Sequence, residues 1–191
     1  MDKVYITAQM LLEDSFRLAE KVYSDDFRPK FVIGIWRGGT PVGIAVQEYL
    51  EYKKVITDHI AIRTSSYIGI NKQSKEIKVH GLQYLIENAN ADDSLLIVDD
   101  VFDSGRSVDA LLKETTRLMR LNTPKDIRIA TPWYKPGNNK TNIVPDYYVH
   151  ETSEWLVFPH ELSGLTREEL MKKDDLANIR ELFDLWYPSI D

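Results

Sequence analysis

The feature that most constrains the fold is the segment 95–107, in which a short apolar run leads directly into acidic residues. Residues 95–98 are all aliphatic, which is typical of a buried strand. Acidic, small and hydroxyl residues follow in the order Asp99, Asp100, Asp103, Ser104, Gly105 and Ser107. A helical pattern starts at residue 107 and continues to 121. A strand that passes through a polar loop into a helix is the repeating unit of parallel α/β sheets.

The rest of the chain shows the same alternation of strand and helix patterns. Further strands are expected at 31–35, 55–64, 127–133 and 147–150. Further helices are expected at 8–26 and 40–49, the second with Thr40 as its cap and Pro41 in its first turn. We therefore expect an α/β fold, a mostly parallel twisted sheet with helices on both faces. Ligands of such sheets bind beyond the carboxyl ends of the strands.

Two other segments differ from this alternation. Residues 65–78 are polar and rich in lysine, which favours a mobile loop. Thr166 and Glu169 form a capping-box pattern that predicts a C-terminal helix from 166 to about 187.

The composition restricts the classes of function. The 191-residue chain has 43% hydrophobic and 28% charged residues, which is typical of a globular domain. Its net charge of -6 argues against a broad nucleic-acid surface. The absence of cysteine excludes disulfides and thiolate metal sites. Neither a membrane-length apolar run nor a secretory signal is visible, so a cytoplasmic protein without membrane partners is expected.

The acidic loop after residue 98 favours a phosphorylated sugar as ligand. Asp99 and Asp100 repel each other unless sugar hydroxyls or Mg²⁺ offset their charges. The turn from Asp103 to Ser107 would direct successive N–H groups from a helix start toward a phosphate. The alternative is a strand that ends in solvated acids, with Ser107 as a helix N-cap. The complete segment favours the ligand site because each part of the turn then has a role.

This segment resembles the signature with which type I phosphoribosyltransferases bind phosphoribosyl pyrophosphate (PRPP). Residues 35–39 resemble the pyrophosphate loop of that family, and 62–79 resemble the flexible lid of its 6-oxopurine members. Residues 155–159 resemble the hood of bacterial and archaeal xanthine/guanine phosphoribosyltransferases. The resemblance implies the type I phosphoribosyltransferase fold as a single domain over 1–191. Its hood would come from the N-terminus and about 144–165, with an added C-terminal helix at about 166–187.

The resemblance also implies the residues that bind PRPP. Asp99 and Asp100 match the pair that holds the ribose 2′- and 3′-hydroxyls, and Asp103 matches an acid near purine N7, a candidate general acid or base. Arg37 and Gly38 match the residues that grip pyrophosphate, after a peptide bond that is often cis. The 5′-phosphate loop corresponds to Ser104, Gly105, Arg106 and Ser107. The family usually has threonine at position 104, so the hydroxyl is retained. From its sequence alone, Arg37 could equally be a surface charge.

Further matches concern the purine base. Lys135 matches a lysine that donates to purine O6, Trp155 an aromatic that stacks on the base, and Leu156 a residue whose backbone reads the purine edge. Ser66 and Tyr67 match the tip of the lid. Without the resemblance, Lys135 would be read as an exposed loop cation and Trp155 as a core residue.

Magnesium is the cofactor that the resemblance implies. Asp99 and Asp100 would hold it largely through PRPP and water, and Glu161 falls where the family has an acid linked to a second Mg²⁺. His160 stands where bacterial and archaeal relatives often have tryptophan. A lone histidine is more often structural than a metal ligand.

We therefore expect Mg²⁺-dependent transfer of the phosphoribosyl group from PRPP to hypoxanthine, guanine or xanthine, a purine salvage reaction. The partners would be PRPP and the base, and the assembly a homodimer or homotetramer. One alternative is a phosphoribosyltransferase for another base, against which Lys135 and Trp155 argue. A second is a PRPP-sensing regulator without turnover. A weaker third is a response-regulator or phosphatase-like domain, which leaves the turn at 103–105 unexplained.

Overall fold

The computed structural model describes residues 3–68 and 75–184. Two compact units are present, one formed by Met1–Leu11 with Glu154–Asp191 and the other by Leu12–Ser153. No helix within these described residues is long and apolar enough to cross a bilayer. That the whole of 1–191 is a single domain stays a prediction.

The larger unit is built on one sheet, which confirms the predicted α/β class. Its strands have the order β4-β3-β2-β5-β7-β6, and β8 also pairs with β7. Every pairing is parallel except that of β3 with β4. The strands are β2 (Phe31–Trp36), β3 (Asp58–Ile68), β4 (Lys75–His80), β5 (Ser94–Val98), β6 (Val101–Phe102), β7 (Asp126–Tyr134) and β8 (Tyr147–Glu151).

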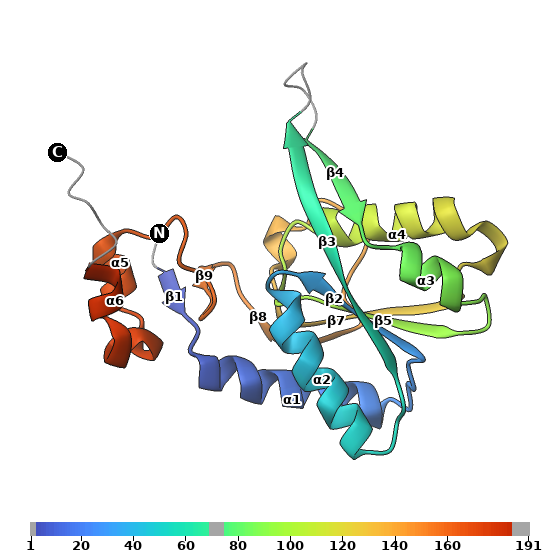
Figure 1. Ribbon diagram of the computed structural model, residues 1–191, viewed down its shortest axis with the longest axis horizontal. Helices are drawn as coiled ribbons and strands as arrows, with labels where there is room; N and C mark the ends of the chain where they lie inside the picture. Colours follow the sequence, from blue (N-terminus) through green and yellow to red (C-terminus); the bar gives the residue numbers. More distant parts are fainter. Residues whose placement is uncertain (1–2, 69–74, 185–191) are drawn as a thin grey trace. The chain divides into compact units, whose positions relative to one another are not determined.

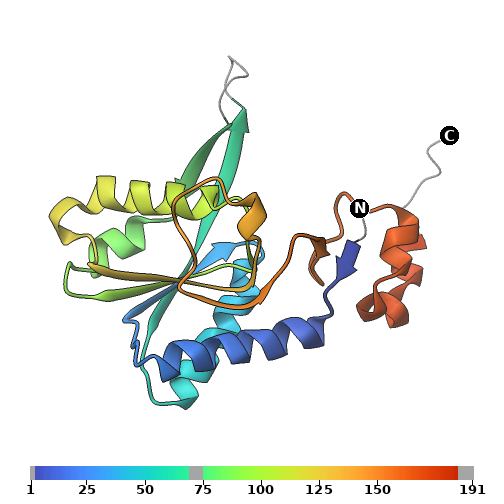
Figure 2. The ribbon, with the colours of Figure 1, turned by 180° about the vertical axis from the view of Figure 1, so that it is seen from behind.

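Helices cover both faces of this sheet, as predicted. Figures 1 and 2 show α3 and α4 on one side, and α2 with residues 12–24 of α1 on the other. The helices are α1 (Ala8–Ser24), α2 (Gly39–Tyr52), α3 (Gln83–Asn88) and α4 (Arg106–Met119). Two 3-10 turns are η1 (Arg120–Asn122) and η2 (Pro136–Asn138).

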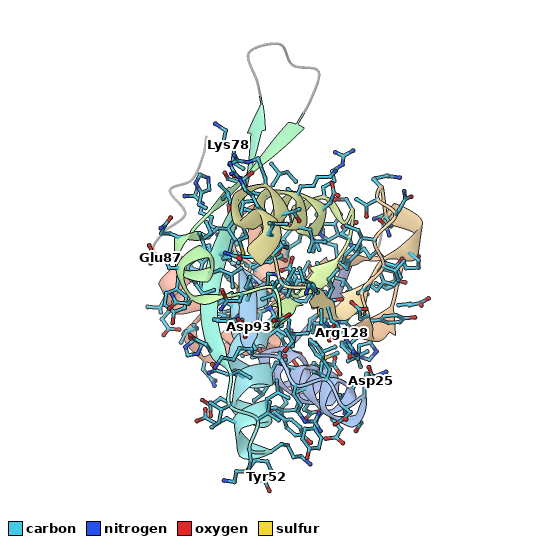
Figure 3. All side chains as sticks on the ribbon, turned by 90° about the vertical axis from the view of Figure 1, so that its right-hand side faces the viewer. Asp25, Tyr52, Lys78, Glu87, Asp93 and Arg128 are labelled. Carbon is cyan, nitrogen blue, oxygen red and sulfur yellow. The ribbon has the colours of Figure 1, made fainter. Side chains whose placement is uncertain are left out.

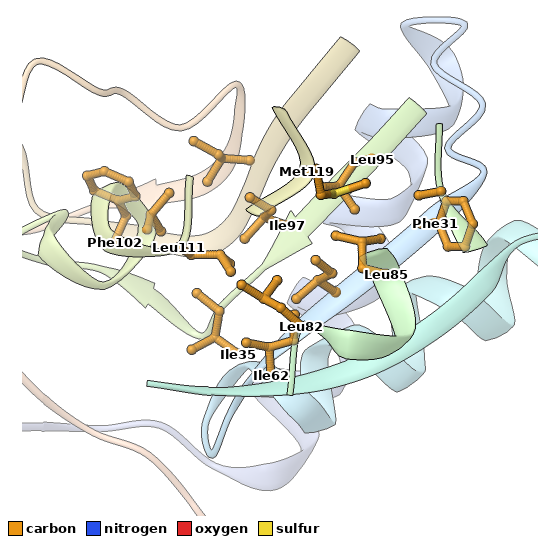
Figure 4. Packing of buried hydrophobic residues seen from close by; sticks show 14 of the residues in the cluster. Phe31, Ile35, Ile62, Leu82, Leu85, Leu95, Ile97, Phe102, Leu111 and Met119 are labelled. Carbon is orange, nitrogen blue, oxygen red and sulfur yellow. The ribbon is translucent and has the colours of Figure 1, made fainter. Parts of the chain in front are cut away.

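The main core lies between the sheet and helices α3 and α4 (Figure 4). Buried strand residues such as Ile62 and Ile97 pack there with Leu85 of α3 and Leu111 of α4. Truncating a fully buried leucine of this kind to alanine costs about 2–5 kcal/mol of stability. The polar loops therefore follow strands whose side chains are tightly packed in the core.

Polar contacts connect the end of α1 to the sheet on the other face. Figure 3 labels Asp25, which follows α1, and Arg128, which lies on β7. Nη1 of Arg128 lies 2.5 Å from Oδ2 of Asp25. The hydroxyl of Tyr147 also donates to Asp25 at 2.8 Å. Burial and this hydrogen bond to Asp25 raise the pKa of Tyr147 to about 12.

The prediction that Thr40 caps the second helix is wrong. Helix α2 begins at Gly39, its N-cap is Gly38, and the cap has no side-chain hydrogen bond. The Thr40 N–H instead donates to the carbonyl oxygen of Arg37 at 3.1 Å. Gly38 takes the N-cap place with a backbone that is already helical, at φ -63° and ψ -34°.

The prediction of a loop over 65–78 is wrong for the described part of that segment. Strands β3 and β4 form an antiparallel hairpin in which Arg63 is opposite His80 and Ile68 is opposite Lys75. Ser66 and Tyr67 lie on β3, opposite Ile77 and Glu76. Pairing between the two strands satisfies the backbone hydrogen-bonding groups, so the hairpin needs few apolar side chains. Its polar composition therefore resembled that of a loop. Residues 69–74 lie outside the described residues.

The smaller unit contains a two-stranded parallel sheet of β1 (Lys3–Tyr5) and β9 (Trp155–Val157). It also contains α5 (Arg167–Met171), η3 (Asp174–Ile179) and α6 (Glu181–Asp184). The predicted capping box is present, since Thr166 Oγ1 accepts from the Glu169 N–H at 3.2 Å and the Glu169 carboxylate accepts from the Thr166 N–H at 2.9 Å.

The continuous helix predicted for 166–187 is wrong. The described part is divided into α5, η3 and α6. The interruption occurs at Lys173, whose backbone is extended with ψ 111° and whose side chain is buried. Capping signals indicate where a helix starts, whereas the burial of Lys173 after α5 is a tertiary feature that such signals do not reveal. Residues 185–187 lie outside the described residues.

Candidate active site

The candidate site of the larger unit lies where parallel strands end. β2 leads into Arg37, β5 into Asp99, and β7 into Lys135. Because β2, β5 and β7 are parallel neighbours, their carboxyl ends meet at one edge of the sheet. The fold therefore brings three loops together that are far apart in sequence.

The backbone of Gly38 and Gly39 lies directly against the acidic loop. A Cβ on Gly38 would lie 1.9 Å from Oδ2 of Asp100. A Cβ on Gly39 would lie 2.5 Å from the carbonyl oxygen of Val98 and 2.8 Å from Cα of Asp99. The Trp36–Arg37 peptide bond is cis, as the resemblance implied. Two consecutive glycines are thus required by a close contact between the two loops.

Asp99 is held in an environment that disfavours its ionisation. Burial raises the pKa of Asp99 well above its usual range, and the charge of Asp100 raises it further. The backbone N–H of Asp100 donates to Asp99 Oδ1 at 3.1 Å, which offsets part of this effect. Hydroxyl donors or a cation at this position would relieve the remaining repulsion.

Replacing Asp99 by asparagine is expected to stabilise the protein near neutral pH. The pKa of Asp99 is higher in the folded protein than in the unfolded chain, so its ionisation lowers the stability progressively as the pH rises through the folded value. Asp99→Asn should therefore increase the free energy of unfolding by about 0.5–2 kcal/mol at roughly pH 8, and little at about pH 3. Urea denaturation in EDTA at both pH values measures this. The exposed Asp92→Asn is the control, and destabilisation by Asp99→Asn at the higher pH would contradict the prediction.

Asp103 and Lys135, which are distant in sequence, form a pair in the structure. Lys135 follows β7, and its N–H donates to the carbonyl oxygen of Phe102 at 2.9 Å. Its Nζ lies 3.3 Å from Oδ2 of Asp103, while Asn138 Nδ2 donates to Oδ1 at 2.9 Å. Lys135 is only 6% exposed, so it is not an exposed loop cation, whereas the Asp103 side chain is 46% exposed. No motif in the sequence marks Asn138, which lies within the turn η2.

The predicted phosphate turn begins helix α4. Gly105 has a φ of +74°, which favours glycine, and a Cβ there would meet Thr141 Oγ1 at 2.6 Å. The helix starts at Arg106 with Gly105 as N-cap and no side-chain cap bond, so the alternative in which Ser107 is the N-cap is wrong. The carbonyl oxygen of Ser104 accepts from the Lys140 N–H at 3.0 Å. The loop after β7 therefore packs against the turn at 104–105, through the Lys140 N–H and the Thr141 hydroxyl. The sequence did not indicate this contact of Thr141.

Two arginines line a cavity beside the carboxyl end of β2 and the middle of β3. Trp36 and Arg63 are paired in register, and together with Arg37 and Thr64 they surround a cavity of about 450 Å³. Guanidinium groups bind phosphate oxygens through paired N–H donors. Arg37 is exposed and lines this cavity, so its ligand-binding role stays a prediction. The cavity also adds Arg63, which the sequence placed only within the lid motif.

The remaining predicted residues belong to the smaller unit. Trp155 is 55% exposed, so it is not a core residue, and the buried Leu156 pairs with Val4 of β1. The carboxylate of Glu161 accepts from the Phe158 N–H at 3.0 Å. The His160 ring stacks on Phe158 with ring centroids 5.7 Å apart. Among the described residues of both units, no three histidine or acidic side chains converge as metal ligands.

Comparison with known proteins identifies the class. The model of the phosphoribosyl transferase domain matches residues 6–163, so the chain belongs to this family and is a phosphoribosyltransferase. Membership confirms the resemblance drawn from the sequence and excludes the response-regulator or phosphatase-like alternative. Comparison with curated protein sequences gives no significant match.

Solved structures agree with this assignment. The chain is 31% identical to a purine phosphoribosyltransferase from Pyrococcus horikoshii Ot3, with a TM-score of 0.69 over 87% of this chain and 99% of that one. A Helicobacter pylori xanthine-guanine-hypoxanthine phosphoribosyltransferase is 20% identical, with a TM-score of 0.64 over 82% and 92% of the two chains. A hypothetical protein from Neisseria gonorrhoeae with bound ppGpp is also 20% identical, with a TM-score of 0.71 over 85% and 91%. The last two similarities establish the fold alone.

Proposed function

We propose that this phosphoribosyltransferase transfers the phosphoribosyl group of PRPP to a 6-oxopurine, giving a nucleoside 5′-monophosphate and pyrophosphate. The observation that carries this proposal is the pairing of Asp103 with the buried Lys135 beside the acidic loop. An acid and a buried cation at this distance offer one acceptor and one donor to the edge of a purine. The 31% identical P. horikoshii purine phosphoribosyltransferase supports the same class of base.

PRPP would occupy the three strand-end loops of the larger unit. Asp99 and Asp100 would accept hydrogen bonds from the ribose 2′- and 3′-hydroxyls. The N–H groups and hydroxyls of the turn 104–107 would bind the 5′-phosphate. Arg37 and the Gly38 backbone would bind pyrophosphate, and Arg63 lines the same cavity as Arg37. The contact between Gly38 and the Asp100 carboxylate supports this arrangement, because it places the two loops side by side.

Magnesium suits the chemistry of these loops. Asp99 and Asp100 are hard oxygen ligands, and Mg²⁺ is commonly held by one or two carboxylates together with substrate phosphates and water. Burial and the charge of Asp100 both raise the pKa of Asp99, and a cation bound here would offset both effects. When bound, the ion would neutralise charge on the departing pyrophosphate. Glu161 is a further candidate ligand, although its carboxylate already accepts a backbone hydrogen bond.

Three residues would contact the base, as the resemblance implies. Lys135 would donate to purine O6, Trp155 would stack on the ring, and the Leu156 backbone would meet the purine edge. A buried ammonium group favours an oxo over an amino substituent, because an amino group would leave the donor unpaired. Ser66 and Tyr67 of β3 would cover the reacting groups and exclude water during the reaction.

The reaction breaks the bond between ribose C1′ and the pyrophosphate oxygen and forms a bond from purine N9 to C1′. Positive charge develops on the ribose while the bonds exchange, and the nearby carboxylates stabilise it. The base loses one proton overall. Asp103 would hold or accept that proton at N7, which its exposed carboxylate allows.

The direct test is a turnover assay with PRPP, Mg²⁺ and a panel of bases. We expect nucleotide formation with hypoxanthine, guanine or xanthine, and little with adenine, orotate or uracil. Activity confined to the last three would assign the enzyme to another base. PRPP binding without any turnover would indicate a regulator that retains the fold. Size measurement in solution would test the proposed homodimer or homotetramer.

Lys135→Met should lower kcat/KM for 6-oxopurines by about 100-fold, because a charge-assisted hydrogen bond to O6 is lost. The control is Lys140→Met, an exposed lysine of the same loop. Both variants are compared by steady-state kinetics with each base in turn. Equal kcat/KM values in Lys135→Met and wild type would contradict the O6 assignment.

A further inference from the structure

A buried lysine in the C-terminal segment is not part of the function proposed above. Lys173 is 2% exposed and lies between α5 and η3. Its Nζ donates to the carbonyl oxygen of Phe158 at 2.5 Å and to that of Glu161 at 3.0 Å. The family match ends at residue 163, so this lysine lies outside it.

A buried ammonium group requires such acceptors. Removing a charged amine from water is costly unless its donors are satisfied. Burial lowers the pKa of Lys173, while the negative charges of Glu161 and Asp175 oppose that shift. The two carbonyl oxygens satisfy most of the donor capacity of the side chain, so the lysine and the turn that accepts its bonds depend on each other.

The two acceptors lie at the two ends of one turn. In this turn the Glu161 N–H donates to the Phe158 carbonyl oxygen at 3.0 Å, and the Phe158 N–H donates to the Glu161 carboxylate at 3.0 Å. Strand β9 (Trp155–Val157) ends immediately before it. The ammonium group of Lys173 therefore fixes the backbone at the point where β9 ends.

The rest of the C-terminal segment is attached to the N-terminal residues of the same unit. Lys3 of β1 pairs with Glu169 at 2.5 Å, and the Asp175 carboxylate accepts from the Ala8 N–H at 3.0 Å. β1 in turn pairs with β9. The segment thus holds β9 both through the turn 158–161 and through its partner strand.

We propose that Lys173 is a positioning residue for purine binding, which it serves by holding the turn 158–161 and the end of β9. It touches no substrate itself, and its effect passes through the backbone to Trp155 and Leu156. The inference rests on the proposed function, in which these two residues contact the base. The PRPP-binding residues belong to the larger unit, so PRPP binding should not depend on Lys173.

The kinetic test separates the two substrates. Lys173→Met, which keeps the length but removes the charge and donors, should raise KM for the purine about tenfold or more. KM for PRPP should stay within about twofold, because the loops proposed to bind PRPP belong to the larger unit. Lys173→Gln, which retains an N–H donor, should show a smaller increase. The neighbouring, exposed Lys172→Met should match wild type. Parallel increases in both KM values, or an unchanged purine KM, would overturn the proposal.

Hydrogen exchange tests the physical basis without any substrate. In Lys173→Met the amides of Phe158 and Glu161 should exchange about tenfold faster or more, while those of β5 and α4 keep their wild-type rates. Unchanged rates at Phe158 and Glu161 would refute the role of Lys173. If the wild-type enzyme used no 6-oxopurine, the proposed function would fail, and this measurement would still show whether Lys173 holds the turn.

Discussion

Replacing Asp103 by asparagine is expected to lower kcat by about 10²–10⁴-fold and to leave KM for PRPP within about threefold. The carboxylate is 46% exposed and lies within reach of Lys135 and Asn138, so it is oriented by its neighbours and remains open to a substrate. Asparagine preserves the size and an acceptor oxygen but cannot take up a proton. Steady-state kinetics with hypoxanthine, guanine and xanthine measure the effect.

The matched control for this change is Asp92→Asn, an acid-to-amide substitution at a side chain that is 95% exposed. It should retain wild-type kcat. Thermal unfolding of both variants shows whether a loss of activity reflects a loss of structure. A folded Asp103→Asn enzyme with nearly unchanged kcat would remove Asp103 from the proton-transfer step.

Replacing Gly39 by alanine is expected to abolish measurable turnover and to lower the free energy of unfolding by about 1–3 kcal/mol. The added Cβ would lie 2.5 Å from the carbonyl oxygen of Val98 and 2.8 Å from Cα of Asp99, both backbone atoms that cannot rotate away. Either the start of α2 or the end of β5 must then shift. Gly38→Ala should cost less stability but raise KM for PRPP, because its Cβ would displace the Asp100 side chain, which can rotate.

Gly137→Ala provides the control for this substitution. A Cβ at that position would have no atom within 4 Å, so its activity and stability should match those of wild type. Denaturant unfolding and a PRPP titration distinguish the three variants. Wild-type affinity of Gly39→Ala for PRPP would show that the contact between the two loops has no part in binding it.

Much of the fold was predictable because its signals are local. The strand expected at 95–98 lies within β5, and the helix expected at 8–26 is α1. Buried parallel strands need continuous apolar runs and surface helices need a periodic face, so both patterns are visible in a single sequence. The structural roles of Gly38, Gly39 and Gly105 were also predictable. Close approach of two backbones and a positive φ both restrict a position to glycine.

The features that were not predictable depend on contacts between distant segments. Nothing near Lys173 indicates that its ammonium group is buried against the turn at 158–161, at the point where the expected C-terminal helix is interrupted. Asn138 reaches Asp103 only because β6 and β7 are paired. The β3–β4 hairpin was hidden because a polar hairpin obtains its order from backbone hydrogen bonds.

The contact between Gly39 and Val98 has a further consequence for how this chain can vary. The atom that excludes a side chain at position 39 is a carbonyl oxygen, which every amino acid at position 98 would also carry. No second substitution at 98 can therefore make room for a larger residue at 39. At position 39 the nearest atoms between the loops proposed for the ribose and pyrophosphate parts of PRPP are main-chain atoms, so the spacing of the loops at this point is a property of the polypeptide backbone.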